Sequence, residues 1–229
     1  MEMFRKITTR HEYITNKAKS QHYRVITVRG VSDICYTEVM NKAVSDWVVK
    51  LHQKKTKYLT NLIDEFLDKK GKIMDLGCGS GEVSKKLLEE GYKVTSVDVV
   101  AKLKVSGVKE IIYDGEHLPF ADKEFDQVLL ITVLHHVPKF EELLQEVARV
   151  SKEIVIVEDV YENWWDKVCI WFWDGLLNLE FLGHPHNNRS DTEWKEIFRK
   201  LGFTLKGEKA GSIREIIYAF KQKAYWLSV

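Results

Sequence analysis

The chain has 229 residues, 45% of them hydrophobic, and a formal net charge of +1 at pH 7, which predicts one large domain or a domain with a small extension. No apolar run approaches the roughly 20 residues that span a bilayer, and the opening residues MEMFRK lack the apolar segment of a secretory signal. Three widely spaced cysteines, Cys35, Cys78 and Cys169, argue against a disulfide framework or a cysteine-rich metal site and favour a cytoplasmic location.

The small net charge conceals an asymmetry between the two parts of the chain. Residues 1–60 hold 12 Lys and Arg against 5 Asp and Glu, whereas residues 61–229 hold 23 against 29. A basic segment on an acidic body is compatible with contact to phosphate, to a membrane surface or to the body itself, and also with a solvated cap of mixed charge. We expect a basic N-terminal cap over residues 1–53 and a main domain over residues 54–229.

The N-terminal part predicts one strand and two helices. Residues 23–29 alternate as a strand does, and apolar residues recur at helical spacing over residues 36–49 and again over residues 54–67. We expect the second helix to pack on a sheet and the earlier segments to cover a ligand cleft.

A glycine-rich stretch at residues 72–81, KIMDLGCGSG, organises the rest of the chain. A short apolar run ends near an acid, Asp75, and three glycines then alternate with small residues, which lets the backbone turn sharply and approach a ligand. Residues 82–91 follow as a helix with Val83, Leu87 and Leu88 on one face. Strand, glycine turn and helix form the first unit of a nucleotide-binding α/β sheet, although the same pattern also occurs in turns that bind nothing.

The remaining chain continues to alternate strands and helices. Strands are expected over residues 93–98, 111–113, 124–132 and 153–159, with a helix over residues 140–150 and no clear helix in the crossover after Asp98. Such alternation gives a parallel sheet with right-handed crossovers.

The chain is expected to end differently. A helix over residues 193–203 precedes two strands, 203–208 and 215–221, joined by a turn at Gly211 and Ser212. Strands so close in sequence must pair antiparallel.

Acidic residues follow the predicted strands at the ligand end of the sheet. Asp98 lies 17 residues after Gly81, where a carboxylate accepts the hydroxyls of a ribose. An ordinary helix N-cap is the other interpretation of Asp98. A further acid, Asp114, follows the third strand.

Together these motifs resemble the class I S-adenosylmethionine (SAM)-dependent methyltransferases of type 11, which act on small molecules. The matching stretches are residues 74–81, 96–98, 114–120, 125–130 and 134–137. The resemblance covers roughly residues 55–160. It implies a Rossmann-like α/β fold, with a mostly parallel seven-stranded sheet, a C-terminal antiparallel strand pair and helices on both faces.

The resemblance also implies the residues that bind SAM. Asp75 would hold the amino group of the cofactor, Asp98 the ribose hydroxyls, and Asp114 the exocyclic amine of adenine. The other expected cofactor contacts are Gly77, Cys78, Gly79, Gly81 and Thr132 at the methionine end, and Val99, Gly115 and Glu116 at the adenine ring.

Three other classes of protein share some of these features. A dinucleotide-dependent oxidoreductase would carry Gly-x-Gly-x-x-Gly, whereas this chain has Gly-x-Gly-x-Gly. Enzymes of this fold that methylate an amino group of a base usually carry Asn/Asp-Pro-Pro-aromatic where residues 132–135 read TVLH, so a nucleic-acid acceptor is not expected. Only the basic N-terminus is compatible with RNA as an acceptor. A catalytically silent SAM-binding partner protein remains an alternative.

The chemistry determines which catalytic groups to look for. Methyl transfer is a direct displacement at carbon, so the protein mainly aligns the reactants and excludes water. A base is required only where the acceptor must lose a proton, and His135 and His136 are the candidates; alternatively, one packs under the next helix and the other donates a hydrogen bond. Some quinone-pathway relatives carry metal-binding acids at the positions of Thr132 and His135. Because this chain lacks them, no metal is expected.

Residues 160–190 are strongly aromatic and lie where this family often inserts a substrate lid. An apolar wall suits a hydrophobic or aromatic small-molecule acceptor, including a lipid-tailed one met at a membrane surface through peripheral contact. The same side chains are also compatible with a second core against the N-terminal helices. His184 and His186 are candidates for the acceptor pocket. The oligomeric state is not predicted.

Overall fold

The computed structural model describes residues 42–166, 168, 188–215 and 218–229. The chain divides into two units, residues 1–45 and 46–229, and the description below concerns the second. Several of the sequence predictions concern residues outside the described ranges. They are the strand over residues 23–29, most of the aromatic segment 160–190, and the acceptor-pocket candidates His184 and His186. The extents of the predicted cap, main domain and lid stay predictions.

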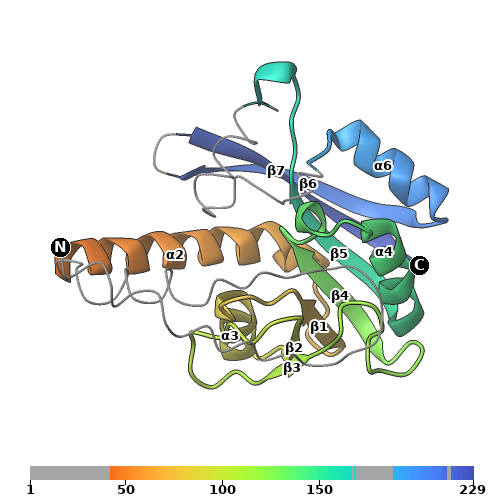
Figure 1. Ribbon diagram of the computed structural model, residues 1–229, viewed down its shortest axis with the longest axis horizontal. Helices are drawn as coiled ribbons and strands as arrows, with labels where there is room; N and C mark the ends of the chain where they lie inside the picture. The colour runs from red at the N-terminus through yellow and green to blue at the C-terminus, as the bar shows by residue number, and fades with distance from the viewer. Residues whose placement is uncertain (1–41, 167, 169–187, 216–217) are drawn as a thin grey trace, which may run out of the picture. The chain divides into compact units, whose positions relative to one another are not determined.

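A seven-stranded sheet in the order β3-β2-β1-β4-β5-β7-β6 forms the centre of the second unit (Figure 1). The strands are β1 Lys72–Leu76, β2 Lys93–Asp98, β3 Glu110–Ile112, β4 Phe125–Ile131, β5 Ser151–Asp159, β6 Thr204–Glu215 and β7 Tyr218–Ser228. Strands β1 to β5 pair parallel, and β7 runs antiparallel to both of its neighbours. The predicted mostly parallel sheet with a C-terminal antiparallel pair is confirmed. All five parallel strands therefore present their carboxyl ends at one edge.

Helices cover both faces of this sheet. They are α2 Lys42–Ile63, α3 Glu82–Glu89, α4 Phe140–Val150 and α6 Asp191–Lys200, with short 3₁₀ turns η1 Asp64–Phe66 and η2 Leu134–His136. One apolar core joins α2 and α3 to Ile73, Leu129 and Val155. The other core joins α4 and α6 to alternate strand positions such as Met74 and Ile156, because successive strand side chains point to opposite faces.

The two helices expected over residues 36–49 and 54–67 are instead continuous within the described chain. Helix α2 runs from Lys42 to Ile63 without a break, and η1 follows it. The intervening residues Leu51, His52 and Gln53 include neither glycine nor proline, so nothing local interrupts the backbone hydrogen bonds.

The predicted turn at Gly211 and Ser212 is wrong. Both residues lie inside β6, where Gly211 pairs with Gln222 and Ser212 with Lys221. A Cβ atom at Gly211 would collide with the hydroxyl of Tyr58 from α2, so this glycine serves a close helix–sheet contact and not a turn.

Strand β7 also extends seven residues beyond the prediction that ended at Lys221. Its later residues are buried on both faces, Tyr225 and Leu227 in one core and Ala224 and Trp226 in or against the other. A strand buried on both sides does not show the polar–apolar alternation by which strands are recognised.

Candidate cofactor site at the carboxyl edge of the sheet

The glycine loop after β1 has the backbone that its sequence predicts. Gly77, Gly79 and Gly81 have φ angles of 77°, 52° and 82°, a region that side-chain-bearing residues rarely adopt. The amides of Gly77 and Cys78 both donate to the carbonyl of Val97 at the end of β2, at 2.8 and 3.2 Å. The loop is thereby held across the edge of the sheet.

Asp75, near the end of β1, is almost fully buried, with 2% of its surface exposed. Its Oδ2 accepts a hydrogen bond of 2.5 Å from the hydroxyl of Ser84 on α3, and the hydroxyl of Ser96 on β2 donates in turn to that of Ser84 at 2.8 Å. Burial raises the pKa of Asp75 to about 6; the negative charge of Asp98 adds to the rise, and the Ser84 hydrogen bond opposes it.

Ser84 was missed by the sequence analysis. The predicted inward face of α3 included Leu88, but Leu88 is 36% exposed whereas Ser84 is fully buried. Its position in the sequence could have indicated this role. Ser84 lies in the first turn of the helix that follows the glycine loop, and this turn faces Asp75 of β1.

The raised pKa of Asp75 predicts a specific pH dependence of stability in the ligand-free protein. Because the folded-state pKa of about 6 exceeds the ordinary value of 3.8, the folded protein keeps a proton that the unfolded chain has released. The free energy of unfolding therefore falls as pH rises from about 4 to about 6. In an Asp75→Asn variant this loss, up to about 3 kcal/mol, is expected to be absent.

Urea unfolding of both proteins at pH 4, 5, 6 and 7 measures the effect. The stability of the variant relative to the parent should increase with pH. The buried Asp159, whose pKa burial also raises to about 6, is common to both proteins and cancels. A difference that stays constant across this range would contradict the prediction.

Asp98 holds the glycine loop to the end of β2. Its Oδ2 accepts the amide of Gly79 at 2.8 Å, and its Oδ1 accepts the amides of Val99 and Val100 at 2.7 and 3.2 Å. The interpretation of Asp98 as a helix N-cap is wrong, since residues 99–109 contain no helix. A carboxylate oxygen accepts two hydrogen bonds, so Oδ2 keeps capacity for a ligand hydroxyl; the ribose contact itself stays a prediction.

The residues expected at the adenine lie at the ends of β2 and β3. Asp114 is exposed, and its Oδ1 accepts the amides of Glu116 and His117, each at 2.8 Å. Both hydrogen bonds hold the pKa of Asp114 below its ordinary value, and the one from the amide of His117 contributes most. A Cβ atom at Gly115, whose φ is 86°, would lie 3.5 Å from Val99, so the structure brings these two residues together.

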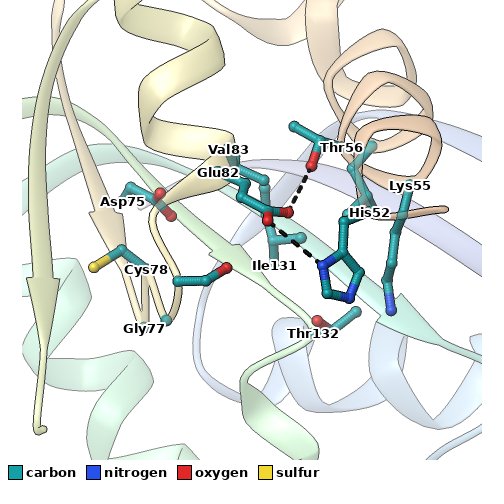
Figure 2. A pocket seen from close by; sticks show the side chains of 13 residues that line it. His52, Lys55, Thr56, Asp75, Gly77, Cys78, Glu82, Val83, Ile131 and Thr132 are labelled. Carbon is teal, nitrogen blue, oxygen red and sulfur yellow. Dashed lines mark hydrogen bonds and ion pairs between the residues drawn. The ribbon is translucent and has the colours of Figure 1, made fainter. Parts of the chain in front are cut away.

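A pocket of about 300 Å³ lies over the glycine loop (Figure 2). Five of the predicted residues line it: Asp75, Gly77, Cys78, Gly79 and Thr132. The other predicted cofactor residues, Gly81, Asp98, Val99, Asp114, Gly115 and Glu116, are not among the residues that line it. The pocket thus corresponds to the predicted methionine end of the site, and the predicted ribose and adenine contacts follow along the edge towards β3.

Helix α2 contributes a wall of the pocket, although its residues from 54 onwards were expected only to pack on the sheet. His52, Lys55 and Thr56 line the pocket together with Glu82 from the start of α3. Glu82 Oε2 accepts a hydrogen bond from the Thr56 hydroxyl at 3.2 Å, and His52 Nδ1 lies 3.6 Å from Glu82 Oε1. These residues were missed because the predicted helix break fell beside them.

Thr132 has the strained backbone often seen at ligand sites. Its φ is 53°, which is uncommon for a β-branched residue. Its amide donates to the carbonyl of Val157 on β5 at 2.7 Å, and this contact fixes the turn at the end of β4.

The two histidines after β4 do not line the pocket. His135 is 3% exposed, and its Nδ1 lies 2.6 Å from Oε2 of the fully buried Glu158. Oε1 of Glu158 accepts the amides of Val133 and Leu134 at 3.0 and 2.7 Å. The ring of His136 lies 4.0 Å from that of His135 between centroids. Glu158 was missed by the sequence analysis, and a catalytic role for either histidine stays a prediction.

Two kinds of feature are absent from the described residues. No group of three or more His, Cys, Asp or Glu in that part of the chain is arranged to hold a metal ion. No helix there combines the length and the apolar character that crossing a membrane requires.

Comparison with known proteins agrees with this geometry. Residues 74–156 match the family model of a methyltransferase domain of type 11. The chain is 35% identical over 85 residues to a demethylmenaquinone methyltransferase of Corynebacterium urealyticum, covering 35% of this chain and 37% of that protein. It is 29% identical over 103 residues to a ubiquinone biosynthesis O-methyltransferase of Rickettsia bellii, covering 38% and 41%. These matches thus span about two fifths of the relatives' own lengths.

The fold extends the likeness beyond the matched segment. The structure is similar to the crystal structure of magnesium protoporphyrin IX methyltransferase from Synechocystis PCC 6803, which was determined with bound SAH (S-adenosylhomocysteine). The TM-score is 0.56 at 16% sequence identity, and the match covers 83% of this chain and 89% of that one. The architecture is therefore that of the class I SAM-dependent methyltransferases. Within that class of fold, residues 74–156 are similar to the methyltransferase domains of type 11.

Proposed function

We propose that this protein binds SAM at the carboxyl edge of its sheet and transfers the methyl group to a small hydrophobic or aromatic acceptor. The observation that carries the proposal is the buried Asp75 beside the glycine loop, in a pocket that Gly77 and Gly79 also line. An anionic side chain and a bare backbone suit a ligand that carries an ammonium group and a sulfonium. They do not suit a pyrophosphate, which binds where amides and positive charge meet it.

The protein's own residues would bind and orient the reactants. SAM supplies a methyl group that its sulfonium already makes reactive. The loop formed by Gly77, Cys78, Gly79 and Gly81 would lie under the methionyl part, Asp98 would accept the ribose hydroxyls, and Asp114 would accept the adenine amine. Thr132 at the end of β4 would border the methionine end.

The class of acceptor is supported by the relatives and by one local feature. The Corynebacterium, Rickettsia and Synechocystis proteins are named for a demethylated menaquinone, for ubiquinone biosynthesis and for a porphyrin. Trp164 and Trp165, which begin the aromatic segment after β5, are 65% and 69% exposed. Exposed aromatic side chains suit a planar apolar acceptor or a lipid-tailed one. The cytoplasmic location stays a prediction.

Calorimetry followed by an acceptor screen tests the proposal. The protein is titrated with SAM, with S-adenosylhomocysteine (SAH, the demethylated product) and with NAD. We expect micromolar binding of SAM and SAH, as is common for such sites, and none of NAD. Absence of SAM and SAH binding would overturn the proposal.

Transfer from labelled SAM is then measured with quinols, phenols and porphyrins, and with RNA. Labelling of a small aromatic compound supports the proposal. SAM binding without turnover on any acceptor favours the silent partner protein, and labelling of RNA alone favours an RNA methyltransferase.

A further inference from the structure

The turn after β4 meets one buried carboxylate, that of Glu158 on β5. None of the Glu158 side chain is exposed. Its Oε1 accepts the amides of Val133 and Leu134, and its Oε2 lies 2.6 Å from Nδ1 of His135, so three consecutive residues of the turn converge on one side chain of the neighbouring strand. Because a buried carboxylate is costly unless hydrogen bonds surround it, the turn and the carboxylate stabilise each other.

This turn also forms part of the pocket over the glycine loop. Thr132 lines the pocket, and its amide donates to the carbonyl of Val157, the residue before Glu158. The side chain of Val133 lies directly against the glycine loop, since a Cβ atom on Gly77 would come within 2.6 Å of its Cγ2. Two adjacent residues of β5 thus fix the turn that borders the proposed methionine end.

The same hydrogen bonds bear on the proton between Glu158 and His135. A backbone amide only donates, so Oε1 is an acceptor, and the proton that bridges the 2.6 Å contact is held by either Oε2 or Nδ1. An imidazole is a stronger base than a carboxylate. The acid Asp159, which interacts electrostatically with His135, also favours a proton on the ring. Both effects favour Nδ1.

We propose that Glu158 is a positioning residue of this site: it holds the turn after β4 against the glycine loop and keeps a proton on Nδ1 of His135. Whenever the ring is neutral, its Nε2 then carries the lone pair, so any proton that His135 exchanges with its surroundings passes through Nε2. The link to cofactor binding rests on the proposed function, whereas the assignment of the proton concerns the chain alone.

Nitrogen NMR of the protein with isotope-labelled histidine tests where the proton lies, because protonated and bare ring nitrogens differ widely in chemical shift. In the parent protein, Nδ1 of His135 is expected to be protonated. In Glu158→Gln the side-chain oxygen keeps the amides of Val133 and Leu134, so the side-chain NH2 group faces Nδ1 and the ring proton is expected on Nε2. A His135→Asn variant identifies the signals of this ring.

A matched control lies on the same strand. Glu153, near the start of β5, accepts hydrogen bonds from the side chains of Lys206 and Trp226, so Glu153→Gln should leave Nδ1 of His135 protonated. A bare Nδ1 in the parent protein, or an Nδ1 that stays protonated in Glu158→Gln, would overturn the assignment of the proton.

Calorimetric titration with SAH tests the hold on the turn. Glu158→Gln keeps an acceptor for both turn amides and should bind SAH within about twofold of the parent. Glu158→Ala leaves both amides without that acceptor and should lose affinity about tenfold or more, with thermal unfolding verifying that the variant is folded. If Glu158→Ala does not fold, the spectra of Glu158→Gln decide the proposal.

Two outcomes of the titration separate this proposal from the proposed function. Parent-like SAH affinity in a folded Glu158→Ala variant would overturn the positioning role and leave the proposed function intact. Failure of the parent protein to bind SAH would overturn the proposed function, while the spectra would still decide where the proton lies.

Discussion

A Gly77→Ala variant is expected to lose SAH affinity by about a hundredfold or more. Gly77 has a φ of 77°, and a Cβ atom placed there would lie 2.6 Å from Cγ2 of Val133. Val133 cannot easily retreat, because its amide and that of Leu134 donate to the buried Glu158. The glycine loop must therefore move away from its position, and the pocket wall that Gly77 forms, the proposed methionine end, moves with it.

Calorimetric titration with SAH measures this loss, and Gly91→Ala provides the matched control. Gly91 also has a positive φ, 89°, but a Cβ atom there would have no neighbour within 4 Å. Both variants incur the backbone strain of a left-handed alanine, about 1–2 kcal/mol, so urea unfolding should show a comparable loss of stability from that source. Only Gly77→Ala should lose SAH binding. Parent-like SAH affinity in Gly77→Ala would show that the loop does not contact the cofactor.

An Asp98→Ala variant is expected to lose both affinity and stability. The carboxylate accepts three backbone amides, those of Gly79, Val99 and Val100, and only 7% of the side chain is exposed. Leaving buried donors without a partner costs about 1–3 kcal/mol in the free energy of unfolding. Because the same residue is proposed to accept the ribose hydroxyls, SAH affinity should fall by a further large factor, about fiftyfold or more.

Two comparisons separate the loss of binding from the loss of stability. Asp98→Asn keeps one acceptor oxygen and should fall between the parent and the alanine variant in both measurements. Asp68→Ala removes an exposed aspartate whose carboxylate accepts the amide of Lys70 and does not line the pocket, and it should leave SAH affinity unchanged. If Asp98→Ala binds SAH as tightly as the parent, the ribose assignment is wrong.

The local sequence pattern was enough to predict most of the parallel strands and the glycine loop after β1. The apolar runs of β1, β4 and β5, the three glycines after β1, and the acids Asp75, Asp98 and Asp114 can be recognised from neighbouring residues alone. A buried strand, a left-handed turn and an acid at a strand end each depend on a few consecutive positions. For the same reason, the helix predicted over residues 140–150 matches α4, Phe140–Val150, at both ends.

Contacts between distant residues decided the rest. Gly211 indicates a turn until Tyr58 is packed against it. No local pattern predicts that the buried partner of His135 is Glu158, 23 residues later. The α2 wall of the pocket depends on Thr56 meeting Glu82, 26 residues away. Such contacts form only once the sheet has brought its helices together, because their free energy comes from burial and pairing that no short stretch of sequence contains.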